Sequence, residues 1–101
     1  MKEPYYAVIF TSLQTNTTDG YSEMAHAMEN LAKLQPGFIG VESAREEVGI
    51  TISYWKTTDD IKNWKGNLDH LMAQKLGKDQ WYRWYKVRIC KVEREYDFYN
   101  D

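Results

Sequence analysis

The sequence predicts an α+β domain in which four strands and two helices follow one another in the order β-α-β-β-α-β. Three observations support this prediction. Short runs rich in β-branched and aromatic residues read as strands. Two longer segments place apolar residues at the spacing of an amphipathic helix. Turn-forming residues separate these segments, and a chain of 101 residues is long enough for a single domain over residues 1–101.

The first strand and the first helix are predicted from the N-terminal third of the chain. Residues 5–13 (YYAVIFTSL) are β-branched and aromatic, and the polar run QTNTTDG follows them as a loop. Thr18 or Asp19 is expected to cap a helix there. Apolar residues recur at helical spacing over residues 24–32, and Gly37, which follows a proline, marks the end of this helix.

A hairpin is predicted in the middle of the chain. Residues 38–44 (FIGVESA) and 50–55 (ITISYW) read as its two strands, and the charged segment REEVG forms the turn. Gly49 in that turn is available for a positive φ. Trp55, at the end of the second strand, is expected to pack in the core.

The second helix is predicted to begin after Thr57 or Thr58, and a long strand follows it. The last strand, YKVRICKVEREY (85–96), alternates apolar and polar residues, but its phase shifts between Ile89 and Cys90. This shift indicates either a β-bulge or a strand that is buried on both faces. The apolar stripe of the second helix consists of Ile61, Trp64, Leu68, Leu71 and Met72.

This order of elements is the ferredoxin-like fold, in which two helices cover one face of a four-stranded antiparallel sheet. In the first strand, residues 8–10 (VIF) are apolar in succession, so both faces of the strand are apolar. The face away from the helices therefore needs another cover. Two such sheets packed face to face would bury it, and the sequence predicts a homodimer.

Composition argues against several classes of function. A net charge of −2 does not favour a nucleic-acid partner. No apolar run approaches the length of about 18 residues that spans a membrane, and MKEPYY lacks the apolar segment of a signal peptide, so the predicted location is the cytoplasm. Cys90 has no second cysteine and no clustered histidine beside it, and we expect a buried structural thiol and no metal site.

Four blocks of the sequence resemble the antibiotic biosynthesis monooxygenase-like family. They are QPGFIGVESARE, GITISYW, IKNWKGNLDH and KVEREY, and the resemblance covers nearly the whole chain. The resemblance implies a dimeric α/β barrel with a pocket in each protomer between the sheet and the helices. Some family members oxidise electron-rich polycyclic phenols with O₂ and without a cofactor. Others degrade haem or oxidise quinols, and many have no assigned activity.

Five residues are candidates for such a site. Trp64 matches the helical tryptophan that several family members place in the pocket, although its position on the apolar stripe also fits a packing role. Tyr54, Tyr82 and Tyr85 are candidate substrate-binding residues, because their phenols could donate hydrogen bonds to a substrate oxyanion. His70 is the candidate catalytic base, although helical spacing places it opposite the apolar stripe.

Haem degradation is disfavoured by the sequence. The haem-degrading branch combines an asparagine on the first strand, the helical tryptophan and a ligating histidine about three turns further on. AVIFTS contains no asparagine, and the three-turn position falls near Gln74, which cannot serve as the axial ligand. His70 lies too early and on another face of the helix. We therefore expect no haem and no other cofactor.

The sequence therefore predicts a homodimeric small-molecule-pocket protein, a cofactor-independent monooxygenase of an aromatic, phenolic or quinol-like substrate. In that mechanism a deprotonated polyphenol supplies the electrons to O₂. The protein contributes a dry cavity, orientation and hydrogen-bond donors. The alternative is a non-catalytic ligand-binding or stress-associated dimer with the same pocket.

Overall fold

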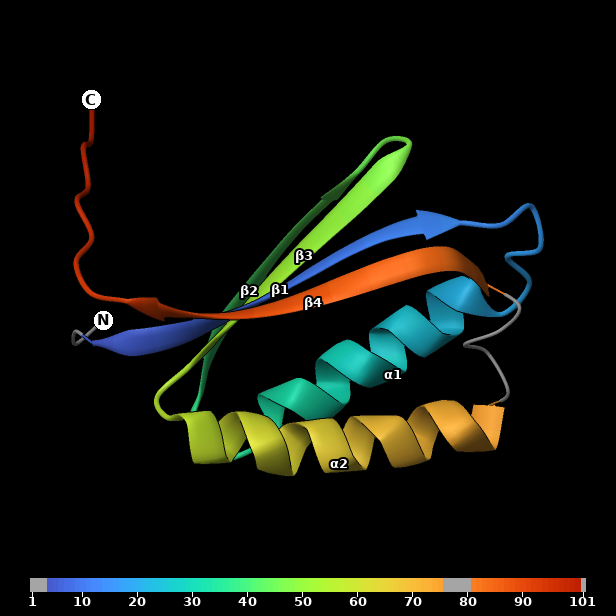
Figure 1. Cartoon of the computed structure of the whole chain (residues 1–101), viewed down its shortest axis with the longest axis horizontal. Coiled ribbons are helices and arrows are strands. Elements are labelled where there is room, and N and C mark those ends of the chain that lie inside the picture. Colours follow the sequence, from blue (N-terminus) through green and yellow to red (C-terminus); the bar gives the residue numbers. More distant parts are fainter. Residues whose placement is uncertain (1–3, 76–80, 101) are drawn as a thin grey trace.

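The computed structural model of the chain describes residues 4–75 and 81–100 and, for residues 71–75, the backbone alone. Its strands form an antiparallel sheet in the order β2-β3-β1-β4, and both helices lie on the same side of it (Figure 1). The predicted α+β ferredoxin-like fold is confirmed. The elements are β1 (Tyr5–Gln14), α1 (Tyr21–Lys33), β2 (Phe38–Arg45), β3 (Val48–Trp55), α2 (Thr58–Lys75) and β4 (Tyr82–Val92).

The two helices begin differently. Gly20, with a φ of 80°, occupies the N-cap of α1, so the prediction that Thr18 or Asp19 caps this helix is wrong. Thr57 caps α2 as predicted, because its Oγ1 accepts a hydrogen bond of 3.1 Å from the backbone N–H of Asp60. In the part of the chain that the structure describes, no helix is long and apolar enough to cross a membrane.

The register of the sheet determines which side chains face the helices. Val8 and Phe10 of β1 pack with helix residues, so the even-numbered residues of β1 from Tyr6 to Ser12 lie on the helix-facing side. The odd-numbered residues point to the other side, together with their partners on β3 and β4. We call this second side the open face, and its larger apolar residues are Tyr5, Ile9, Leu13, Val48, Ile50, Ile52, Tyr54, Trp84 and Val92.

Two groups of hydrophobic residues fill the helix-facing side. Trp55 is fully buried, which confirms its packing role, and its indole N–H donates to Ser53 Oγ at 2.8 Å. The tryptophan cluster consists of buried Val8, Ala32, Trp55 and Ile61 with half-buried Tyr6, Phe38 and Trp64. The tyrosine cluster consists of buried Met24, Trp81 and Tyr82 with half-buried Phe10, Tyr21, Ala27 and Met28.

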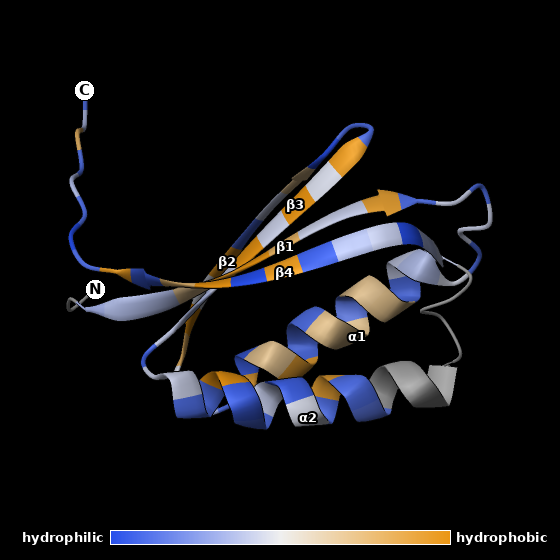
Figure 2. Cartoon of the chain, viewed as in Figure 1, coloured by the Kyte–Doolittle hydropathy of each residue, from blue (hydrophilic) through white to orange (hydrophobic). Residues whose placement is uncertain are grey.

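The open face carries uncovered apolar side chains. Val48, Ile50 and Trp84 are each more than two-fifths exposed, at 45%, 43% and 45%. Figure 2 shows apolar and polar residues alternating along β3 up to the hairpin tip. Cys90 is exposed, contrary to the prediction of a buried thiol, because its pairing with Ala7 places it on this face.

The irregularity of β4 lies at its beginning rather than at its centre. Pairing with β1 is regular across Ile89 and Cys90, and the register shifts only between Leu13 and Gln14 of β1. Ile89 and Cys90 are exposed on opposite faces of the strand. Neither a bulge at that point nor burial on both faces explains the phase shift in the sequence. Both predictions for this segment are wrong.

Candidate functional site

An apolar strip of β4 stays uncovered on the helix-facing side of the sheet. Tyr85, Val87 and Ile89 pair with helix-facing residues of β1, yet their side chains are 37%, 38% and 54% exposed. The α1 residues of the tyrosine cluster reach β4 at Tyr82, and the three side chains further along the strand remain uncovered. We call these three residues the β4 strip. Apolar side chains exposed beside a hydrophobic core offer a surface for a ligand.

A register shift brings Tyr82 and Tyr85 together at one end of the β4 strip. Residues three positions apart point to opposite faces of a regular strand. The shift between Leu13 and Gln14 inserts an extra residue opposite β1, so both tyrosines lie on the helix-facing side. Their ring centroids are 5.7 Å apart, and the rings meet edge to face.

The phenol of Tyr82 is held in its neutral form. Burial raises the pKa of Tyr82, and a long hydrogen bond of 3.5 Å from its hydroxyl to that of Tyr21 raises this pKa further. The positive charge of Arg45 acts in the opposite direction and lowers the pKa. Because the raising effects dominate, Tyr82 remains a hydrogen-bond donor throughout the neutral pH range.

Aromatic rings extend the tyrosine cluster over the sheet. Phe10 stacks on Tyr85 with centroids 5.3 Å apart and planes inclined by 22°. Tyr21 meets Tyr82 and Trp81 edge to face, with centroid distances of 5.9 Å and 5.7 Å. The indole N–H of Trp81 donates to the Asp19 carbonyl at 2.9 Å, which ties the start of α1 to the start of β4. The arrangement is a wall of aromatic rings with phenol groups at one end.

The sequence analysis missed two residues at this site, Tyr21 and Arg45. Tyr21 follows the Gly20 N-cap directly, and only the tertiary fold brings its ring to Tyr82. Arg45 was part of the predicted charged turn, but it ends β2 and its guanidinium donates to Ser12 Oγ across the sheet. No motif in the sequence marks either residue.

Trp64 and Tyr54, two of the predicted binding residues, lie away from the tyrosine pair. Trp64 belongs to the tryptophan cluster, with its ring centroid 5.0 Å from that of Trp55. Its indole N–H is buried and has no hydrogen-bond partner among the residues that the structure describes. Tyr54 lies on the open face, where burial raises its pKa and a hydrogen bond with Glu42 raises it further. The structure therefore brings together Tyr82 and Tyr85 but not all four residues.

His70, the candidate base, is exposed on α2. Figure 1 shows the C-terminal half of α2 at the same end of the molecule as the start of α1, which carries Tyr21. The two neighbouring charged residues on this helix, Lys65 and Asp69, form an ion pair of 2.9 Å. Among the described residues, no group of three or more His, Cys, Asp or Glu side chains is placed to hold a metal ion.

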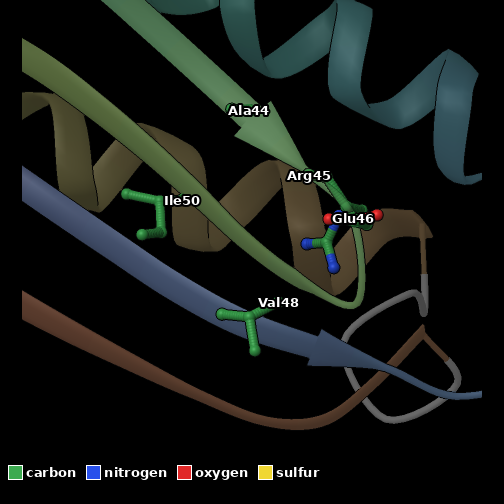
Figure 3. A pocket seen from close by; sticks show the side chains of 5 residues that line it. All are labelled: Ala44, Arg45, Glu46, Val48 and Ile50. Carbon is green, nitrogen blue, oxygen red and sulfur yellow. The ribbon is translucent and has the colours of Figure 1, made fainter.

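A shallow hollow lies at the tip of the β2–β3 hairpin. Figure 3 shows the side chains that gather around it, with Val48 and Ile50 on the open face and Arg45 at the end of β2. The hollow is wide open to solvent, and Ala44 and Glu46 complete its lining. Its lining contains no tyrosine. Its apolar residues Val48 and Ile50 belong to the open face, whereas Arg45 belongs to the helix-facing side.

Several solved structures share the fold of this chain. The chain has the fold of the antibiotic biosynthesis monooxygenase-like proteins. SnoaB from Streptomyces nogalater, described as a cofactor-independent oxygenase, superposes in a variant form with a TM-score of 0.74 at 10% identity, over 90% of this chain and 95% of that chain. PA3566 from Pseudomonas aeruginosa has a TM-score of 0.69 at 12% identity, over 95% and 99% of the two chains.

A third structure with this fold comes from Bordetella bronchiseptica and carries the provisional name antibiotic biosynthesis monooxygenase. Its TM-score is 0.69 at 15% identity, over 93% of this chain and 99% of that chain. No protein-family model matches the sequence. The uncharacterized protein YqjZ of Bacillus subtilis is 48% identical over 94 residues, which are 91% of this chain and 82% of YqjZ. The chain belongs to the same family as YqjZ.

Proposed function

We propose that the protein binds an aromatic small molecule against the β4 strip and oxidises it with O₂ without a cofactor. The observation that carries this proposal is the exposed apolar strip on the helix-facing side, with the neutral phenol of Tyr82 at its end. Exposed apolar patches mark binding sites, and in small-molecule sites a few convergent polar groups fix the orientation of the ligand. SnoaB, which shares the fold, is described as a cofactor-independent oxygenase. In this proposal the protein acts in the cytoplasm, the location that the sequence predicts.

The substrate class is an electron-rich phenol, quinol or anthrone. Its deprotonated form passes one electron to O₂, and the two radicals then combine to form a carbon–oxygen bond. In an anthrone the methylene carbon becomes a carbonyl, which retains one oxygen atom of O₂. The other oxygen atom leaves as water with the two methylene hydrogens. The substrate supplies all the electrons, so the reaction requires no outside reductant.

Each residue of the site has a specific role in this proposal. Tyr85 and the rest of the β4 strip stack against the substrate ring and exclude water from one of its faces. Tyr82 donates a hydrogen bond to the substrate oxyanion, which favours the electron-rich form. Trp64 packs against Trp55 behind this surface, and His70, in the C-terminal half of α2, is the candidate base.

Oxygen uptake with a hydroxylated anthrone tests the proposal. The expected result is one O₂ consumed per anthrone at a rate well above the spontaneous reaction. Tyr82→Phe should lower kcat by about tenfold to a hundredfold, because it removes an oxyanion donor. Tyr6→Phe is the matched control, since it removes a phenol from the tryptophan cluster, and it should retain the wild-type rate. If the protein binds the anthrone but O₂ is consumed no faster than in the spontaneous reaction, the result would favour the alternative, a non-catalytic ligand-binding or stress-associated dimer.

The proposal includes a homodimer formed through the open face. Val48, Ile50 and Trp84 expose apolar surface there, and a second sheet would cover it. The C-terminal segment carries three further aromatic rings, Tyr96, Phe98 and Tyr99, which are 84%, 86% and 85% exposed. Figure 1 shows this segment leaving the end of β4 and extending away from the sheet. We expect it to pack on the second copy.

Charges at the two edges of the open face specify how two copies meet. Glu42 lies on β2 and Arg88 on β4, in the same row across the sheet, with Ile52 and Ile9 between them. A two-fold axis parallel to the strands places the β2 edge of one copy over the β4 edge of the other. A two-fold axis perpendicular to the strands and in the plane between the sheets would place β2 over β2 and β4 over β4. Charge complementarity between Glu42 and Arg88 therefore favours the axis parallel to the strands.

Sedimentation equilibrium at micromolar concentration tests this dimer. Arg88→Glu should weaken association by about tenfold or more, because Glu42 of the other copy would then face a carboxylate. The double variant Arg88→Glu with Glu42→Arg should recover most of the loss. Removal of residues 97–101 should also weaken the dimer, since it deletes two of the exposed rings. A monomeric wild-type protein would contradict this part of the proposal.

A further inference from the structure

One row of residues across the helix-facing side connects β2 to Tyr85 of the β4 strip. Arg45 of β2 pairs with Gly49 of β3, Gly49 pairs with Ser12 of β1, and Ser12 pairs with Tyr85 of β4. The row therefore passes from a guanidinium at one edge of the sheet to the phenol of Tyr85 at the other. Ser12 is fully buried at its centre.

Gly49 gives the Arg45 side chain a path along this row. A Cβ at Gly49 would lie 2.2 Å from the Arg45 guanidinium carbon, so only glycine leaves the space that this side chain occupies. The predicted positive φ at Gly49 is wrong, because the positive φ values among the described glycines occur at Gly20 and Gly37. Gly49 serves to let Arg45 lie flat across β3.

The Arg45 guanidinium reaches Ser12 and still has unused donors. Its Nη2 donates to Ser12 Oγ, and its Nη1 lies 3.5 Å from the Ser12 carbonyl oxygen. Arg45 forms no ion pair with any residue that the structure describes, although Glu46 follows it in the turn. A guanidinium carries several N–H donors in a planar fork, which matches the two oxygens of a carboxylate.

The positive charge of Arg45 lies close to the aromatic site. Arg45 contacts Ser12, whose neighbour on the next strand is Tyr85, and the charge of Arg45 also acts on the buried hydroxyl of Tyr82. Arg45 and Tyr85 are both exposed, so a ligand can reach them from solvent. A ring stacked on Tyr85 would therefore have a positive charge near its edge.

We propose that Arg45 binds a carboxylate carried by the aromatic ligand and so selects acidic substrates over neutral ones. This inference rests on the proposed function, because the ring of the ligand occupies the β4 strip. The guanidinium stays on Ser12, and its free donors bind the carboxylate in a forked pair. Arg45 acts as a specificity residue, while Tyr82 faces the oxygen at which the reaction begins.

Binding of a hydroxynaphthoate and of the matching naphthol, which lacks the carboxylate, tests the inference in the full-length protein. We expect the wild type to bind the hydroxynaphthoate about tenfold more tightly or better, since a charge-assisted forked pair forms. Arg45→Gln should reduce this affinity to that of the naphthol and leave naphthol binding unchanged. Lys62→Gln, which removes an exposed positive charge from α2, should retain the wild-type preference.

Gly49→Ala provides a second test that keeps Arg45 in the chain. Its methyl group would collide with the guanidinium, so the side chain must leave Ser12 and the preference should fall. Thermal melts of each variant show whether it is folded. Two results would overturn the role of Arg45 but not the proposed site. One is equal binding of the two ligands by the wild type, and the other is a preference for the hydroxynaphthoate that persists in Arg45→Gln. Failure of both ligands to bind would overturn the proposed site and this inference together.

Discussion

The tryptophan cluster and the tyrosine cluster lie on the same side of one sheet but satisfy their polar groups differently. Trp55 is fully buried, and Ser53 of the same strand accepts its indole N–H at 2.8 Å. Tyr82 is also buried, but the hydroxyl of Tyr21 accepts its hydrogen bond only at 3.5 Å. The short hydrogen bond of Trp55 is typical of a closed core, whereas the long one of Tyr82 leaves a donor that a ligand can use. The exception in the tryptophan cluster is the Trp64 indole N–H, which is buried without a partner among the described residues.

The surroundings of Trp55 are closed by other rings, whereas those of Tyr82 are partly open to solvent. Around Trp55 the rings of Phe38 and Trp64 close the space, with centroid distances of 5.5 Å and 5.0 Å. Around Tyr82 the neighbouring Tyr85 remains 37% exposed, and the charge of Arg45 lies nearby. The first cluster therefore stabilises the fold, and the second combines packing with an accessible aromatic and charged surface.

The largest effect on stability is expected from Trp55→Ala. Removing a fully buried indole leaves a cavity between β3 and α2, and the free energy of unfolding should fall by about 3–5 kcal/mol. Urea denaturation followed by circular dichroism measures this change. A loss below about 1 kcal/mol would show that the tryptophan cluster is not the closed core that its packing indicates.

Trp64→Phe should have a smaller effect on stability. The substitution removes ring volume beside Trp55, but it also removes an indole N–H that is buried without a partner among the described residues. We expect the variant to stay folded, with a loss below about 1.5 kcal/mol in the same denaturation experiment. A large loss together with unchanged ligand binding would place Trp64 wholly in the core. A change in ligand binding would extend the site toward α2.

Tyr82→Phe should have the smallest effect on stability at neutral pH, within about 1 kcal/mol, because the lost hydrogen bond is long. Its effect appears in alkaline solution. Since the pKa of Tyr82 is raised in the folded protein, the stabilising contribution of its neutral phenol is complete below the unfolded value of about 10. That contribution is lost as the pH rises further.

Melting temperatures between neutral pH and strongly alkaline pH measure this contribution. The wild type should lose stability as the pH rises above about 10, and Tyr82→Phe should lose less over the same range. Tyr54, whose pKa is also raised, contributes to the wild-type loss with the same sign. Tyr54→Phe therefore serves as the comparison that separates the two faces of the sheet. Identical alkaline curves for the wild type and Tyr82→Phe would contradict the burial of the Tyr82 phenol.

The order of the elements was predictable from the sequence because hydrophobic periodicity and turn residues mark each of them. The packing role of Trp55 was predictable as well. The alternation of a strand also predicts the position of Tyr54. Because Trp55 faces the helices, the residue next to it must lie on the open face. A paired strand partner, not a local pattern, decides which face each residue occupies.

The tyrosine site could be predicted only in part. Tyr82 and Tyr85 share a face only because of the register shift opposite Gln14, and no residue type in β4 specifies that shift. Arg45 joins the site because Gly49 leaves a path across β3, and this depends on cross-strand pairing. Both features depend on contacts between strands, which the sequence of a single strand does not specify.

The indole N–H signals of the tryptophans test the central claim, that the ligand site lies at the tyrosine cluster, most directly. Trp81 belongs to the tyrosine cluster, Trp55 to the tryptophan cluster, and Trp84 lies on the open face. In an NMR titration with a hydroxynaphthoate, the Trp81 signal should shift in a saturable manner, while those of Trp55 and Trp84 stay in place. Saturable shifts of Trp55 or Trp84 with an unchanged Trp81 signal would place the ligand elsewhere and contradict the account.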